Sequence, residues 1–360
     1  MWKVYGSSVS YYTGKLEAYL RYKGIDYQAL PTPYGEAKML IEKVGAVQMP
    51  IVERDDGRWM SDTTSILLQI EREQPEPSIL PPDPVVRFIA ALIEDYGDEW
   101  LWRPAMHYRW SYRRDRRFIS DHLAEEVGGF IRAPHWLKRM RIAKRQFTNF
   151  VVKDGVNDAT RAHADATYLN ALEAMNAVLA NRPFLLGNAP SLADYGMMGS
   201  MFRHFGQDPT PAEIMRQRAP LVFEWVARMW RAERVDDPQF LDEIQGDMAR
   251  LLRECCETHL VQLAANSECY ARGGTHFDVE IQGYRYTNLP VSRYRVWCLE
   301  QLRESFASLD EAARARVRAL LPHFSAKVLW EGKVPKSGFN TNNHLPFGKA
   351  INVYGEGTPP

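Results

Sequence analysis

The chain has 360 residues, of which 45% are hydrophobic and 25% charged, the composition of a globular protein long enough for two domains or slightly more. Lys and Arg together number 45, as do Asp and Glu, so the formal net charge is zero, which argues against a general binder of nucleic acid or other polyanions. No apolar run reaches the ~18 residues of a membrane span, and the N-terminal residues lack a signal-peptide pattern, so we expect no membrane partner.

The first quarter of the chain alternates short strands with helices. Strands are predicted at 2–5, 25–30, 50–54 and 58–60, and helices at 12–23, 35–43 and 63–73. Gly24 stands where a helix C-cap is expected, and Asp55-Asp56-Gly57 signals a hairpin turn. This order predicts a small α/β unit with too few strands for a large sheet.

Proline and then helical periodicity mark the middle of the chain. The stretch PEPSILPPDP (75–84) predicts an interdomain linker, because few helices or strands could continue through it. From 85 to about 230 apolar residues recur at helical spacing, and Pro104 is expected to kink or break the first long helix. Ser191 and Asp194 are spaced like a capping box at a helix start.

The remainder, 236–360, is expected to be a mainly helical C-terminal extension. Helices are predicted at 239–263, 292–306 and 309–321, the last opened by Ser308, with an irregular tail over 332–360. The single apolar stripes of these helices must be buried somewhere, so we expect the extension to pack on the preceding helices, with 283–297 as the main contact. The predicted division is thus 1–76, a linker at 77–84, 85–235, and the extension.

Four cysteines bear on the compartment and on metals. All lie in the last third of the chain, at 255, 256, 269 and 298, without the spacing of a metal site. Sparse, clustered cysteine is typical of a reducing cytoplasm rather than of a disulfide scaffold. We therefore predict a cytoplasmic protein without a metal.

Four motifs in order resemble the glutathione transferase family over roughly residues 1–235. Tyr5 to Ile25 resembles its first strand, active-site loop and first helix, and Gln48-Met49-Pro50-Ile51 resembles the element in which a cis-proline begins the third strand. The stretches Ser61 to Ile66 and Pro190 to Asp194 resemble the family's helix-start signatures. The resemblance implies a thioredoxin-like α/β domain followed by an all-α helical bundle, working as a homodimer, with the extension as an addition that has no counterpart in the usual pattern.

The active-site loop carries hydroxyl groups where thiol-disulfide relatives of this fold carry cysteine. A helix N-terminus offers unpaired N–H groups and partial positive charge, which stabilise a thiolate. With Ser10 at that position, the resemblance implies that the thiol belongs to bound glutathione and that the Ser10 hydroxyl donates to its sulfur. A plain N-cap role for Ser10 is the alternative, and Ser7, Ser8, Tyr11 and Tyr5 are rival contacts for the sulfur.

Other motif residues are implied to hold the glutathione tripeptide. Met49, before cis-Pro50, would pair its backbone with the cysteinyl unit, and Asp62 and Thr63 would hold the γ-glutamyl group at a helix start. Gln48 is a candidate for the glycyl carboxylate. Aromatic residues between 100 and 112 are expected near an acceptor pocket, unless they only pack, and the aromatic stretch 283–297 is a further candidate to reach that pocket. The basic runs at 113–117 and 138–145 are expected to be solvated faces, with a site for an acidic substrate or partner as the alternative.

The implied function is a detoxifying transferase in which the glutathione thiolate attacks a small, electrophilic, apolar molecule. One alternative is a non-catalytic binding or scaffold protein on the same fold, which the extension would suit. Another is a specialised glutathione-dependent dehalogenase, ether-cleaving enzyme or isomerase. A protein-thiol oxidoreductase is the least favoured, because no cysteine precedes residue 255.

Overall fold

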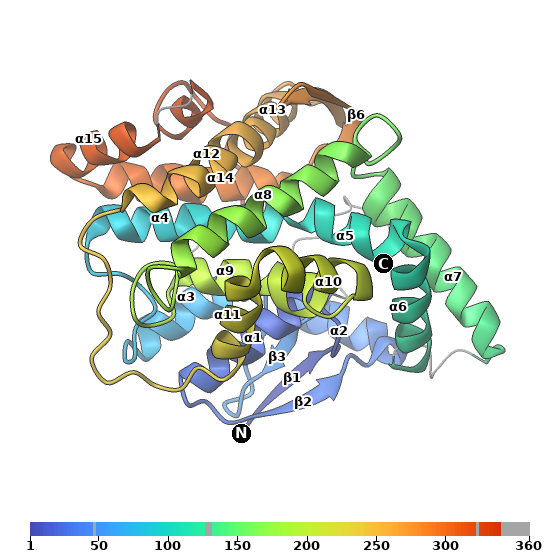
Figure 1. Ribbon diagram of the computed structural model, residues 1–360. Coiled ribbons are helices and arrows are strands. Elements are labelled where there is room, and N and C mark those ends of the chain that lie inside the picture. The colour runs from blue at the N-terminus through green and yellow to red at the C-terminus, as the bar shows by residue number, and fades with distance from the viewer. Residues whose placement is uncertain (46–47, 127–131, 322–323, 340–360) are drawn as a thin grey trace.

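A four-stranded sheet opens the fold in the computed structural model, which describes residues 1–45, 48–126, 132–321 and 324–339 (Figure 1). The strands run in the order β2-β1-β3-β4, with β1 parallel to β2 and antiparallel to β3. Their bounds are β1 Trp2–Gly6, β2 Tyr27–Pro31, β3 Ile51–Glu53 and β4 Trp59–Ser61. The helices α1 Tyr11–Tyr22 and α2 Ala37–Val44 lie between strands, and α3 Thr63–Glu73 follows β4. The predicted β-α-β-α-β-β-α unit is therefore confirmed.

Helices alone make up the next region, as the sequence predicts. They are α4 Pro84–Asp95, α5 Trp102–Ser111, α6 Arg113–Glu126, α7 His135–Phe147, α8 Arg161–Leu179, α9 Leu192–Ser200, α10 Pro209–Arg218 and α11 Pro220–Trp230. Helix α9 contacts both α1 and α4, so it lies between the sheet unit and the rest of the bundle. The capping box that opens α9 is also confirmed, since the Ser191 N–H donates to Asp194 Oδ2 at 3.0 Å.

Pro104 does not break the first long helix at its own position. The break precedes it: α4 ends at Asp95, a π-helical turn spans Tyr96–Trp100, and α5 starts at Trp102. Pro104 thus lies in the first turn of α5, where a missing N–H costs no intrahelical hydrogen bond.

The C-terminal extension covers the outer side of α4 and α8, at the top of Figure 1. Its elements are α12 Ala249–Glu254, α13 Leu260–Ala271, β5 His276–Ile281, β6 Tyr284–Pro290, α14 Arg293–Ser308 and α15 Glu311–Leu320. A continuous set of buried side chains runs from Trp2 in the sheet through the bundle to Leu329 in the extension.

Three expectations for the extension need correction. Residues 239–245 are not helical, because backbone groups of Gln239 and Leu241 bond instead to the loop at 186–188. The hairpin of β5 and β6 was not predicted, and α15 is capped by Asp310 rather than Ser308. Residues 332–339 are irregular, as expected, and the rest of the predicted tail (340–360) lies outside the described residues.

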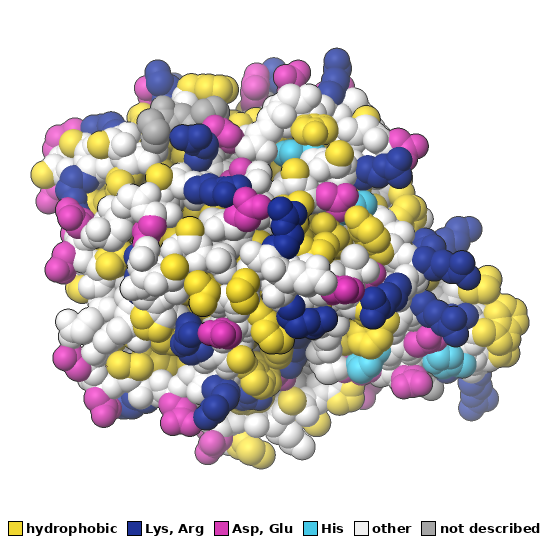
Figure 2. All heavy atoms as spheres, in the orientation of Figure 1, with side chains coloured by type: hydrophobic (Ala, Val, Ile, Leu, Met, Phe, Trp, Pro, Cys, Tyr) yellow, Lys and Arg dark blue, Asp and Glu magenta, His cyan; other side chains and the backbone are white. Residues whose placement is uncertain are grey.

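Three observations bear on possible partners and ligands. None of the residues of α7 is buried, and its basic side chains gather along one edge of the molecule in Figure 2, as a solvated face would. Within the described ranges no helix is long and apolar enough to cross a membrane. The same residues contain no group of three or more His, Cys, Asp or Glu side chains that could hold a metal ion.

Candidate functional site

Strand register brings the three predicted motifs to one edge of the sheet. Ile51, at the start of β3, is paired with Tyr5 near the end of β1 and with Ser61 at the end of β4. The segments just beyond these residues, 6–10, 49–50 and 62–63, therefore leave the sheet side by side. The sequence-predicted residues Ser10, Pro50 and Asp62 belong to these segments.

Ser10 is the N-cap of α1 at this edge. Its Oγ accepts from the Thr13 N–H at 3.4 Å, and the side chain remains partly exposed. The loop approaches the helix closely at Gly6, where a Cβ atom would lie 2.4 Å from Thr13 Cγ2, so only glycine fits. Ser10 thus places a hydroxyl next to the first N–H groups of α1, which have no intrahelical acceptors.

The rival hydroxyl groups are engaged elsewhere. Ser7 Oγ donates to Glu126 on α6, and Ser8 Oγ lies 2.8 Å from His122 Nε2. The Tyr5 hydroxyl donates to Glu53 at 2.8 Å, and burial, then this hydrogen bond, raise the pKa of Tyr5 to about 12. Tyr11 is buried and its hydroxyl donates to the Gly97 carbonyl. Burial, followed by the Asp98 carboxylate, raises the pKa of Tyr11 well above 10.0.

The second motif has the backbone geometry that the resemblance implies. The Met49–Pro50 peptide bond is cis, and Pro50 is buried directly before β3. Gln48 and Met49 are half-buried, so both remain accessible at the sheet edge. This segment can offer the main-chain groups of Met49 to an extended peptide.

Asp62, in the third motif, has an uncommon backbone conformation. Its φ is 74°, and its Oδ1 accepts from the Ser65 N–H at 2.9 Å, which makes it the N-cap of α3. Thr63 is the buried first residue of the helix. The flanking hydroxyl groups of Ser61 and Ser65 are buried and have no hydrogen-bond partner among the described residues. This corner therefore holds polar groups that fit a ligand with both a carboxylate and an ammonium.

A buried ionic network lies beneath the site. Lys15 on α1 is fully buried, and its ammonium lies 2.5 Å from Glu94 and 2.5 Å from Asp98. Burial alone would lower the pKa of Lys15, but the two carboxylates outweigh it and the pKa is raised. The network ties α1 to α4 and to the turn that follows it, so the active-site loop is fixed relative to the helical region.

Among the aromatic residues between 100 and 112, Trp102 contacts the first turn of α1, directly after the loop. Trp102 stacks on Tyr12 with ring centroids 5.7 Å apart and also contacts Phe150. Trp100, Tyr108 and Trp110 are buried, and Trp110 belongs to the same hydrophobic cluster as Val9 of the loop. Tyr12, Trp102 and Phe150 therefore form an aromatic cluster at the start of α1, to which the rest of the aromatic run does not belong.

Several contacts of the loop were not predicted. Two buried arginines hold its carbonyl oxygens: Arg203 donates to Ser7 at 3.0 Å and Arg109 to Val9 at 2.7 Å. Charged residues within otherwise apolar helices were the available signal, but the sequence does not reveal their partners. The Tyr294 hydroxyl, in the extension, donates to Asp62 Oδ2 at 2.8 Å, and nothing in the spacing of the sequence indicates that contact.

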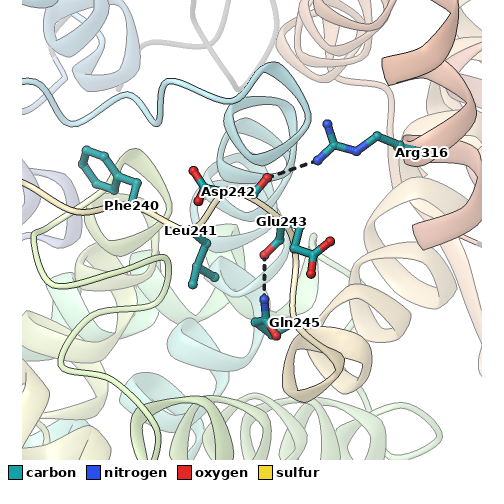
Figure 3. Close-up of a pocket in the computed structure, with 6 residues that line it drawn as sticks. All are labelled: Phe240, Leu241, Asp242, Glu243, Gln245 and Arg316. Carbon is teal, nitrogen blue, oxygen red and sulfur yellow. Dashed lines mark hydrogen bonds between the residues drawn. The ribbon is translucent and has the colours of Figure 1, made fainter.

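One surface cleft lies away from this site. It measures about 470 Å³ and is lined by residues 240–243, by Gln245 and by Arg316 of α15 (Figure 3). Arg316 already donates to Asp83 and to the Asp242 carbonyl, and the other charged groups are acidic. The cleft therefore lacks the features that would hold an anionic peptide.

Two family models match separate parts of the chain. The family model for the glutathione S-transferase N-terminal domain matches residues 4–78, and that for the C-terminal domain matches 140–233. No curated protein matches the chain significantly.

Similar solved structures include three bacterial proteins. The β-etherase LigF from Sphingobium sp. strain SYK-6 is 17% identical, with 63% of this chain and 94% of that chain covered and a TM-score of 0.44. A maleylpyruvate isomerase from Pseudomonas aeruginosa is 20% identical over 66% of this chain and 100% of its own, with a TM-score of 0.36. A glutathione S-transferase from Methylobacterium radiotolerans, in complex with glutathione sulfonate, is 16% identical over 68% and 99%, with a TM-score of 0.36.

Proposed function

The chain belongs to the glutathione S-transferase family, and we propose that it is an enzyme in which the thiolate of bound glutathione attacks a small, electrophilic, apolar molecule. The observation that carries this proposal is Ser10, a partly exposed hydroxyl at the N-terminus of α1. A hydrogen bond from Ser10 and the partial positive charge of the helix both favour a thiolate over a thiol.

The remaining motif residues serve as the proposed grip on glutathione. Asp62 accepts from the γ-glutamyl ammonium, while Thr63 and the first N–H groups of α3 hold its carboxylate. The backbone of Met49 before cis-Pro50 pairs with the cysteinyl unit, and Gln48 reaches the glycyl carboxylate. The acceptor lies against Tyr12, Trp102 and Phe150, and its leaving group departs as the carbon–sulfur bond forms.

Replacing Ser10 tests the catalytic part of the proposal. Ser10→Ala should lower kcat with an aryl halide by roughly 100-fold or more, and should raise the apparent pKa of bound glutathione, while glutathione affinity changes far less. Ser10→Gly is the matched control for a capping role, because glycine caps a helix nearly as well as serine yet lacks the hydroxyl. If Ser10→Gly keeps full turnover while Ser10→Ala fails, the loss reflects capping and the catalytic role is wrong.

The same measurements separate the alternatives. Retention on immobilised glutathione without turnover of any electrophile would support a binding or scaffold protein on this fold. Turnover restricted to an ether, a haloalkane or an isomerisable substrate would support a specialised enzyme that uses the same thiolate.

The setting proposed for the enzyme follows the family resemblance. We propose a homodimer that works in detoxification in the cytoplasm. All four cysteines are free and buried, in keeping with a reducing compartment, and burial raises the pKa of Cys255 and Cys298 well above 9.0.

A further inference from the structure

The start of α14, in the extension, is fixed by hydrogen bonds to α13. Asn266 on α13 is fully buried; its amide accepts from the Ser292 N–H at 2.7 Å and donates to the Ser292 carbonyl at 2.9 Å. Ser292 in turn caps α14 by accepting from the Arg295 N–H. The first turn of α14 is thus held in place from both sides, and its side chains have defined positions.

One residue of that turn contacts the candidate site, and the next residue contacts the turn between α4 and α5. Tyr294 donates its hydroxyl to Asp62 Oδ2 at 2.8 Å, and Arg295 Nε lies 3.3 Å from Glu99 Oε2, on the turn between α4 and α5. Burial, then the charge of Asp62, raises the pKa of Tyr294 well above 10.0. Because the hydroxyl keeps its proton, Tyr294 is the donor in this hydrogen bond.

The carboxylate of Asp62 is consequently held at both oxygens. Oδ1 accepts from Ser65 and Oδ2 from Tyr294, so the plane of the carboxylate is set. Each oxygen can accept more than one hydrogen bond, which leaves lone pairs free for an ammonium. An acceptor that is already oriented loses less freedom when its ligand binds, and this raises affinity.

We infer that the C-terminal extension forms part of the glutathione site, with Tyr294 as a positioning residue that orients Asp62 toward the γ-glutamyl ammonium. The inference rests on the proposed function, because it takes Asp62 as the group that binds this ammonium. It assigns the extension a role in recognising glutathione, which motif resemblance over residues 1–235 does not imply.

Calorimetry on the full chain tests this inference with two ligands. The first is glutathione, and the second is glutaryl-cysteinylglycine, which lacks only the γ-glutamyl amine. Tyr294→Phe keeps the ring and removes the hydroxyl, so it should weaken glutathione binding roughly 5- to 10-fold and binding of the amine-free peptide less than about 2-fold. In turnover, the KM for glutathione should rise with kcat at saturation nearly unchanged.

Tyr286→Phe is the matched control within the extension. It removes a buried hydroxyl that lies 2.8 Å from His163 Nδ1 and has no contact with Asp62, so the affinity ratio of the two ligands should stay at the wild-type value. Equal losses for both ligands in Tyr294→Phe would show a purely structural role and overturn the inference. Unchanged or tighter glutathione binding would also overturn it, the latter because Tyr294 would then compete with the ammonium.

The wild-type protein separates this inference from the proposed function. If wild type binds neither ligand, the proposed function fails and the inference fails with it. Suppose instead that wild type binds glutathione more tightly than the amine-free peptide. If Tyr294→Phe shows the same ratio of the two affinities, only the inference is overturned.

Discussion

At the scale of single residues, the hydroxyl groups in and beside the active-site loop differ in whether they already donate a hydrogen bond. Tyr11 and Ser7 were both catalytic candidates, yet Tyr11 donates to the Gly97 carbonyl and Ser7 to Glu126, each within a buried setting. A buried donor must abandon its present acceptor to reach a thiolate, which leaves that acceptor unsatisfied. Among the described residues, the one hydrogen bond of the Ser10 hydroxyl is the long contact in which it accepts from the Thr13 N–H, so within this part of the chain its own proton stays available.

Tyr11→Phe provides a residue-scale test of this distinction. The variant should keep kcat within about 2-fold of wild type, while the free energy of unfolding falls by about 1–3 kcal/mol because the Gly97 carbonyl loses its donor. Denaturant unfolding and steady-state kinetics on the same preparation measure both quantities. A 100-fold loss of kcat at unchanged stability would transfer the thiol-contacting role from Ser10 to Tyr11.

The residues that could be predicted are those whose role depends on local spacing. The Ser10 cap, the Asp62 cap and the Ser191–Asp194 capping box each join positions three residues apart, so the sequence alone contains the signal. The cis bond before Pro50 came from the resemblance and is present in the structure. Contacts between distant segments, such as Tyr294 with Asp62, depend on how helices pack and left no such signal.

At the scale of elements, the β5–β6 hairpin shows what the sequence could have revealed. Gln282 and Gly283 form its turn with φ values of 50° and 79°, the left-handed pair that a two-residue hairpin turn requires. Glycine was the usable signal, whereas glutamine is not among the residues that favour the first position. The adjoining aromatic stretch, 283–297, was instead interpreted as the main contact with the helical region and as a candidate to reach the acceptor pocket.

This hairpin is joined to α8 through a histidine whose protonation should control the contact. His163 is buried, with Nδ1 2.8 Å from the Tyr286 hydroxyl and Nε2 3.0 Å from Gln282 Oε1. Burial lowers the pKa of His163 to about 4 from its ordinary 6.5, although the hydrogen bond with Gln282 opposes the shift. Between these values the unfolded chain binds a proton that the folded chain does not, so stability is lost as the pH falls from 6.5 to 4.

The expected size of that loss is on the order of 3 kcal/mol, from the difference between the two pKa values. His163→Gln removes the titration, so the free energy of unfolding of wild type relative to this variant should fall by that amount between pH 7 and pH 4. Urea unfolding at a series of pH values measures it, with His276→Gln, at an exposed histidine of β5, as the control. Parallel curves for wild type and His163→Gln would contradict the prediction.

At the scale of the whole molecule, the extension and the helical bundle each bury a surface of the other. Phe306 of α14 packs on Phe88 of α4 with ring centroids 5.9 Å apart, and His259 Nε2 lies 2.7 Å from Asp95 Oδ2. Arg103, only 2% exposed, donates to Gln262 at 2.6 Å. Without the extension, the apolar face of α4 would meet water and these charged groups would lose partners, while the extension would lose the surface that covers its own helices.

Dividing the chain at residue 235 should therefore give two unstable parts rather than two domains. We expect residues 236–360 expressed alone to be unfolded or to aggregate, because their helices carry single apolar stripes that need the bundle. Residues 1–235 should melt at a lower temperature than the full chain, and the full chain should unfold in one calorimetric transition. A soluble 236–360 fragment with its own cooperative melt, together with an unchanged Tm for 1–235, would instead identify a third, independent domain. That result would favour the scaffold alternative, because an extension that folds apart from the bundle could recruit a partner without contributing to the site.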